Sequence, residues 1–165
     1  MTIATTLYNY LAENAVTYDI LDHEHTLSSG QTAQASHVSG DRIAKSVLLE
    51  DEMGYLLAVL PASRRVDLGE LHRQLNRNLG LATEEEIDGL FRDCEPGALP
   101  PIGTAYGMDT IGDDILVEPP ESCFGAGDHA QLIQVRTETF VSRGGVGRRA
   151  RVGGCCGGAA GGGGA

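Results

Sequence analysis

Two apolar runs close together in the chain constrain the fold more than any other feature. They are RIAKSVLLE at 42–50 and YLLAVLP at 55–61, and the short polar segment DEMG joins them. A polar, glycine-containing link between two such runs is typical of a β-hairpin, so the sequence predicts an antiparallel pair of strands. The second run is apolar on both faces, which predicts a strand at the centre of its sheet.

A lysine interrupts the first of these runs. Lys45 shares a strand face with Val47 and Leu49, because side chains alternate along a strand. Two interpretations fit this position. The side chain either runs along the rim of the sheet with its amine in water, or it forms a cationic hook in a pocket for a phosphate, carboxylate or carbonyl oxygen.

The rest of the chain alternates between helical and extended patterns. Asp67 is expected to cap one helix, and Thr83 with Glu86 forms the capping box of the next. Helices are predicted at 3–15, 31–38, 68–79, 82–91 and from 137, and strands at 16–23, 114–118, 122–126 and 130–135. The segment 95–108 is dense in glycine and proline and predicts a loop. Together these elements indicate a single α+β domain.

The composition changes from about residue 143. The segment GGVGRRARVGGCCGGAAGGGGA has no apolar period, so we expect a domain at 1–142 and a disordered Gly/Arg tail at 143–165. Such a tail either contacts RNA through its arginines or is an irregular chain end with no role of its own.

Charge, cysteines and hydropathy limit the functional classes. The net charge of −11 argues against a broad electrostatic grip on nucleic acid and against DNA binding, but it allows a local basic patch. Arg64, Arg65, Arg73 and Arg77 form the one ordered candidate for such a patch, or else a solvated face. The chain has no signal peptide, no membrane span and no Cys-x-x-Cys motif, so we expect a cytoplasmic protein with free thiols.

Two further segments carry residues that suit chemistry. GALPPIG at 97–103 presents rigid backbone that can hold a ligand's polar atoms, or it is a plain crossover. GAGDHAQLI at 125–133 places Asp128 and His129 just before a strand, where the histidine can bind a ligand, act as a base or cap the strand. His23 and His25 lie two residues apart, but no third metal ligand is placed beside them by spacing.

The ordered set of these motifs resembles the YbaK/ProX family, the aminoacyl-tRNA editing domain also inserted in bacterial prolyl-tRNA synthetases. The matching segments are AKSVLL at 44–49, LLAVLPASRRVDLGEL at 56–71, GALPPIG at 97–103 and AGDHAQLI at 126–133. The resemblance spans about residues 5–140. It implies a mixed, curved sheet flanked by helices.

The resemblance also implies roles for individual residues. Lys45 corresponds to the family lysine that holds the substrate's terminal phosphate or its amino-acid end. Gly97 and Pro101 correspond to the G-x-x-x-P loop that positions the ester carbonyl and the water, and His129 corresponds to a histidine near the aminoacyl group. The implied substrate-binding residues are Ser46, Ala98, Leu99, Pro100, Gly103, Gly127 and Asp128.

The implied activity is hydrolysis of the ester of mischarged tRNA by a free-standing domain, without a metal or cofactor. The expected substrate is the acceptor end of proline-specific tRNA carrying alanine, with cysteine and serine next. A synthetase or elongation factor is a possible supplier of that substrate. Two other classes remain open: a module that binds an amino acid, nucleotide or tRNA end without turnover, and covalent chemistry at Lys45 through a Schiff base.

Overall fold

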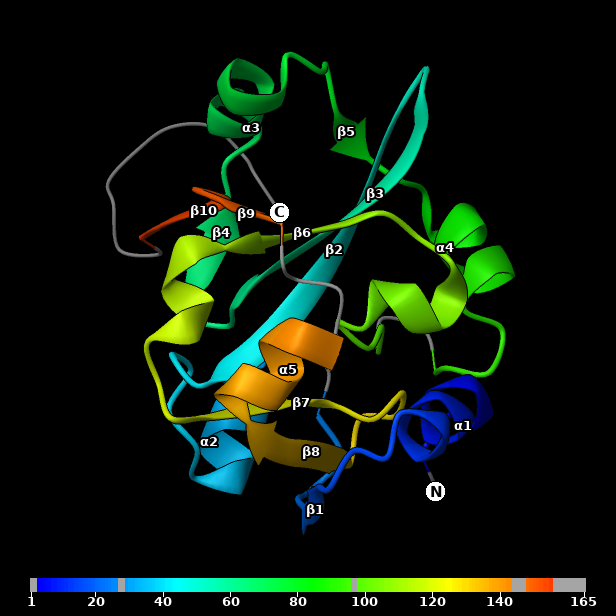
Figure 1. Ribbon diagram of the computed structural model, residues 1–165, viewed down its shortest axis with the longest axis vertical. Coiled ribbons are helices and arrows are strands. Elements are labelled where there is room, and N and C mark those ends of the chain that lie inside the picture. Colours follow the sequence, from blue (N-terminus) through cyan, green and yellow to red (C-terminus); the bar gives the residue numbers. More distant parts are fainter. Residues whose placement is uncertain (1–2, 27–28, 96–97, 144–147, 156–165) are drawn as a thin grey trace.

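A mixed eight-stranded sheet is the framework of the domain (Figure 1). The structure is a computed structural model that describes residues 3–26, 29–95, 98–143 and 148–155. The strand order is β1-β8-β7-β2-β3-β6-β9, and β5 joins the edge of β2. The strands are β1 (Asp19–Asp22), β2 (Ile43–Asp51), β3 (Gly54–Pro61), β5 (Gly80–Leu81), β6 (Thr110–Asp113), β7 (Glu121–Gly125), β8 (Gln131–Arg136) and β9 (Arg149–Ala150).

The predicted hairpin is confirmed as the β2–β3 pair. The two strands are antiparallel in a register that runs from Ala44↔Pro61 to Asp51↔Gly54. β3 lies between β2 and β6, and its residues from Leu56 onward are buried, as the two-sided apolar pattern predicted. At the tip, Arg77 makes two hydrogen bonds of 2.7 and 2.8 Å to the Asp51 carboxylate, so the hairpin is tied to the segment after α3 (Leu68–Leu75).

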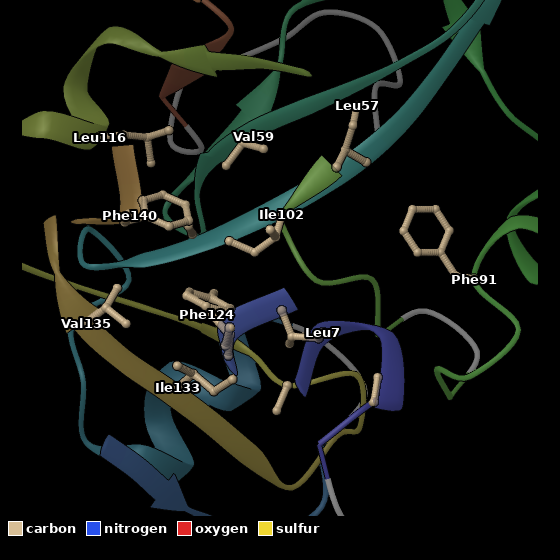
Figure 2. Packing of buried hydrophobic residues seen from close by; sticks show 14 of the residues in the cluster. Leu7, Leu57, Val59, Phe91, Ile102, Leu116, Phe124, Ile133, Val135 and Phe140 are labelled. Atoms are coloured by element: carbon tan, nitrogen blue, oxygen red, sulfur yellow. The ribbon is translucent and has the colours of Figure 1, made fainter. Parts of the chain in front are cut away.

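The helices and short turns cover the two faces of the sheet with separate cores. On one face, α1 (Thr5–Glu13), α4 (Glu84–Leu90), α5 (Thr137–Arg143) and the 3-10 turn η1 (Gly103–Tyr106) pack on a large cluster that includes Leu7, Phe124 and Phe140 (Figure 2). The opposite face carries two smaller clusters, one under α3 and one under α2 (Ser29–Ser36). Within the described ranges, no helix is long and apolar enough to cross a membrane.

The helix starts follow the predicted caps. Asp67 accepts a hydrogen bond of 3.0 Å from the amide of Glu70, and Thr83 and Glu86 form the reciprocal capping box of α4. α3 is shorter than predicted: it ends at Leu75 because Asn76 takes a left-handed conformation with φ of 52°. Asparagine tolerates that conformation better than most residues, so Leu79 is buried outside the helix.

The strand predicted at 114–118 is wrong. Asp114–Val117 form the 3-10 turn η2, and the strand β6 precedes it at Thr110–Asp113. The buried side chain of Asp113 accepts a hydrogen bond from the amide of Ile115, which turns the chain at this point. A short apolar run does not by itself distinguish a strand from a helical turn.

Part of the segment predicted to be a disordered tail is ordered. Arg149–Ala150 form β9 beside β6, and β10 (Gly153–Cys155) pairs with β4 (Arg64–Val66) in a second, two-stranded sheet. Val152 is fully buried in the core under α3, which supplies the apolar contact that the glycine-rich composition did not suggest. Residues 144–147 and 156–165 of the predicted tail lie outside the described residues.

Candidate active site

The strand β2 has different neighbours at its two ends along one edge. β7 pairs with it in parallel at Ile43 and Ala44, and β5 pairs with it at Leu49 and Glu50. Among the strand pairs of the described residues, none covers positions 45–47 on that edge. The sheet therefore opens between β7 and β5, and the Gly/Pro loop borders this opening instead of a strand.

Lys45 lies at this opening on the face of the sheet that carries the two smaller cores. It is directly opposite Leu60 in the β2–β3 register, so the two side chains leave the same face. Ile43 on that face packs in the cluster under α2, and Val47 packs against the cluster under α3. Lys45 is thus half-buried between two cores, and it lines a cleft of about 80 Å³.

The described part of the Gly/Pro loop forms one wall of that cleft. The hydroxyl of Ser46 donates a hydrogen bond of 2.8 Å to the carbonyl oxygen of Leu99, which joins the loop to β2. Ala98 and Leu99 line the cleft, while Pro100 and Pro101 are buried behind them and are not among its lining residues. Gly97 lies outside the described residues.

The turn between β7 and β8 forms the opposite wall. Asp128 is 4% exposed, and its Oδ1 atom accepts hydrogen bonds from the amides of Ala130 and Gln131 at 3.1 and 2.9 Å. Its Oδ2 atom is buried and has no hydrogen-bond partner among the described residues. A buried carboxylate oxygen without a partner is costly, and Asp128 is among the residues that line the cleft.

Gly127 supports this turn from behind. Its φ is +97°, and a Cβ atom at this position would lie 2.5 Å from Cβ of Ala4. Its carbonyl oxygen accepts a hydrogen bond of 2.8 Å from the amide of Glu95, and the carbonyl of Glu95 accepts one of 3.0 Å from the amide of Ala98. The turn and the loop are therefore connected by backbone hydrogen bonds.

A group of histidines lies beside the turn. The ring of His25 meets the ring of His129 edge-on with centroids 5.3 Å apart, and its Nε2 atom lies 3.3 Å from the Glu95 carboxylate. His23 and His129 both line the cleft. The sequence placed no third metal ligand beside His23 and His25, and it did not predict that they lie next to His129. No set of three side chains suited to a metal is present in the described part of the chain.

Gly103 and Cys94, two residues that could serve a reaction, both lie outside this cleft. Gly103 is buried against Thr110 and is not among the cleft's lining residues, so the structure does not bring it together with Lys45. Burial raises the pKa of the Cys94 thiol to about 11, which makes it a poor nucleophile at neutral pH. Among the described residues, Thr32 and Gln131 also line the cleft, although sequence reasoning did not single them out.

A larger groove of about 860 Å³ lies between the α1–β1 connection, β8 and α5. Its lining includes Thr17, Tyr18, Gln134 and Thr139. Of the predicted site residues that the structure describes, none lines this groove. The predicted site residues that the structure brings together therefore line the small cleft and not the larger groove.

The arrangement suits a reaction in which the protein positions its substrate. A half-buried ammonium, an acceptor oxygen and a backbone wall converge on one small volume. Such groups can fix a carbonyl, stabilise developing negative charge and hold a water without a protein nucleophile.

Comparison with protein families gives a match over most of the chain. The sequence model of the aminoacyl-tRNA editing domain matches residues 23–142. That range holds β2, the loop, the β7–β8 turn and all of α5 except its last residue. No curated protein matches the sequence.

Solved structures share the fold at low sequence identity. A candidate trans-editing enzyme for prolyl-tRNA synthetase is 22% identical with a TM-score of 0.80, and the alignment covers 93% of this chain and 99% of that one. A hypothetical protein is 20% identical with a TM-score of 0.79, covering 90% and 99%. A candidate signal transduction protein from Marinobacter aquaeolei VT8 is 19% identical with a TM-score of 0.74, covering 92% of this chain and 31% of that one. These likenesses confirm the predicted α+β fold with a mixed sheet.

Proposed function

This chain belongs to the aminoacyl-tRNA editing domain family, and from that membership we propose that it hydrolyses the ester of mischarged aminoacyl-tRNA as a free-standing enzyme. The observation that carries the proposal is the cleft at the opening of β2. Lys45, the unpartnered oxygen of Asp128 and the wall formed by Ala98 and Leu99 all meet there. The likeness to a candidate trans-editing enzyme supports the same activity.

The aminoacyl end of the substrate supplies partners for the two charged groups. A free α-amino group is a cation at neutral pH, and the buried Oδ2 atom of Asp128 is an acceptor for one of its protons. The ammonium of Lys45 is suited to an oxygen atom, either of the terminal phosphate or of the ester carbonyl. His129 lies next to Asp128 at the cleft and would contact the aminoacyl group.

Hydrolysis then needs little chemistry from the protein. Water attacks the ester carbonyl carbon, the bond from that carbon to the ribose oxygen breaks, and the proton of the water ends on the ribose oxygen. The neighbouring ribose hydroxyl of the substrate assists that proton transfer. The wall formed by Ala98 and Leu99, together with Lys45, fixes the carbonyl and stabilises the oxyanion that forms on it.

The size of the cleft points to a small aminoacyl group. The described residues leave a cleft of about 80 Å³ beside Lys45, which suits a short side chain better than a long one. Alanine is the first candidate, with serine and cysteine next, on proline-specific tRNA. Such an enzyme would act in the cytoplasm, where it would receive its substrate from a synthetase or an elongation factor.

The test is deacylation of proline-specific tRNA charged with alanine, cysteine, serine or proline. We expect wild type to accelerate ester loss on one mischarged species, and Lys45→Ala to return that rate close to background. Arg136→Ala is the control, because it also removes a cation, but at an exposed position away from the cleft. If wild type accelerates none of the four species, the hydrolase is excluded for this panel and a non-catalytic binding module takes its place.

A further inference from the structure

Arginines gather on the surface formed by β4 and the C-terminal strands. We use the name arginine surface for Arg64, Arg65, Arg148, Arg149 and Arg151. These are five of the twelve Lys and Arg residues in a chain whose net charge is −11. Four of them are exposed and Arg64 is half-buried. The segments 64–66 and 148–155 contain no Asp or Glu.

The backbone holds these arginines in fixed positions. β10 pairs with β4, and β9 pairs with β6, so the C-terminal segment links the main sheet to the small one (Figure 1). Val152, which lies between β9 and β10 in the chain, is buried. The amides of Val152 and Gly153 donate to the buried Asp113 carboxylate at 3.2 and 2.7 Å. The arginine surface is therefore mounted on ordered backbone.

The guanidinium groups have no acidic partners in the described ranges. No carboxylate of those ranges lies within 4.0 Å of any of the five. Three acidic side chains close to these segments are engaged elsewhere. Asp113 is buried and binds backbone amides, Asp67 caps α3, and Glu70 pairs with Arg73. The positive charge of the arginine surface is therefore available to an external anion.

The backbone segments that carry these arginines cover the core on the Lys45 side of the sheet. Val66 and Val152 pack with Leu60 in the core under α3, and Leu60 is directly opposite Lys45. Arg64 begins β4 shortly after β3 ends at Pro61, whose partner across the hairpin is Ala44, next to Lys45. The backbone of β4 therefore begins close to the Lys45 end of the hairpin, whereas in β9 Ala150 packs on the core and Arg149 leaves the opposite face of the strand.

We propose that the arginine surface binds the sugar-phosphate backbone of the RNA whose aminoacylated end enters the cleft. This proposal rests on the function proposed above. Guanidinium groups match phosphate oxygens in geometry and charge, and neutralising phosphates releases counterions, so a few such contacts give binding that depends on salt. The acidic remainder of the chain repels RNA, which would restrict docking to this surface and fix its direction.

The direct test measures binding of an uncharged RNA hairpin that copies an acceptor stem, as a function of salt. If three arginines each contact a phosphate, the logarithmic slope is about −2.7, and affinity falls about 40-fold between 50 and 200 mM salt. We expect Arg65→Glu with Arg149→Glu to weaken binding at least tenfold and to flatten the slope. Arg65→Gln with Arg149→Gln should show the same change to a smaller extent.

The matched control is Arg136→Glu with Arg143→Glu, which changes the net charge equally at exposed positions on β8 and α5. Equal weakening in both double variants would overturn the proposal and indicate a general charge effect. No weakening in Arg65→Glu with Arg149→Glu would also overturn it and leave an acidic protein as the partner of this surface. Hairpin binding does not require turnover. A wild type that binds the hairpin in this way but hydrolyses no mischarged tRNA would overturn the proposed enzyme and leave the RNA surface supported.

Discussion

The hydroxyl of Ser46 donates a hydrogen bond of 2.8 Å to the carbonyl oxygen of Leu99, and this contact joins the cleft wall to the strand that carries Lys45. Both residues are half-buried and 53 positions apart in the chain. Because Leu99 belongs to a loop, the position of its carbonyl depends on this contact more than on any strand pairing.

Ser46→Ala should loosen the wall while the domain stays folded. Loss of one part-buried hydrogen bond costs about 1 kcal/mol of unfolding free energy, but the shifted wall should lower kcat on mischarged tRNA by about tenfold or more. Ser46→Thr keeps the hydroxyl and is the control. Urea unfolding and single-turnover deacylation measure the two effects, and an equal loss of activity in both variants would show that the hydroxyl is not the cause.

Asp128→Asn should leave the fold intact and weaken substrate recognition. The amide oxygen can still accept from Ala130 and Gln131, so the turn should persist, but the second carboxylate oxygen is lost. We expect kcat/KM on alanyl-tRNA to fall at least tenfold, because a charge-assisted hydrogen bond contributes about 1.5–3 kcal/mol. N-acetylalanyl-tRNA, which lacks the ammonium, should be hydrolysed equally by both proteins. A variant that loses both substrates alike would argue for a structural role.

Asp51→Asn should change how stability depends on pH. Hydrogen bonds from Arg77 lower the pKa of the Asp51 carboxyl from 3.8 to about 2. Stability from this carboxylate is therefore fully present above about pH 4 and is lost as the pH falls through 2. The difference in urea midpoint between wild type and Asp51→Asn should shrink over that window. Arg77→Gln removes the same ion pair, so its difference in urea midpoint from wild type should shrink in the same way. A difference in midpoint that stays constant from pH 4 to 2 would contradict the prediction.

Val152→Ala should destabilise the protein even though it lies in the glycine-rich C-terminal segment. The side chain is fully buried, so its truncation should cost about 2 kcal/mol and lower Tm by about 4–8 °C. Val117→Ala, at a side chain that is 43% exposed, is the matched control and should change stability little. Equal Tm values for Val152→Ala and wild type would show that this segment does not pack on the core.

Local features were predicted well from the sequence. The hairpin, its two-sided apolar strand and the caps at Asp67 and Thr83 depend on residues close in the chain, where spacing carries the signal. α3 ended early because Asn76 adopts a left-handed conformation, which helical spacing does not report.

The assembly of the site could not be predicted from spacing alone. Lys45, Leu99 and Asp128 come from three separate elements. Only the family resemblance predicted that they share a site, and the structure places them around one cleft. His25 was missed because only the β1–β8 pairing brings it to His129. Val152 was missed because its partners lie in β3, β4 and α3, and a single apolar residue among glycines has no period.

The opening in the edge of β2 has a consequence for how this domain can change. Within a sheet, the neighbour of a strand is usually another strand. A change in that neighbour disturbs its hydrogen bonds to the strands on both of its sides. Here the wall beside Lys45 is a loop outside the strand pairings, held by a hydrogen bond from Ser46, by the packing of Leu99 on the large core and by backbone hydrogen bonds near Glu95. Its residues can be exchanged for others of different bulk while the strand pairings remain intact. Under the proposed activity, an exchange in this loop would alter substrate choice while the pairings of β2 with β3 and β7 stay in place.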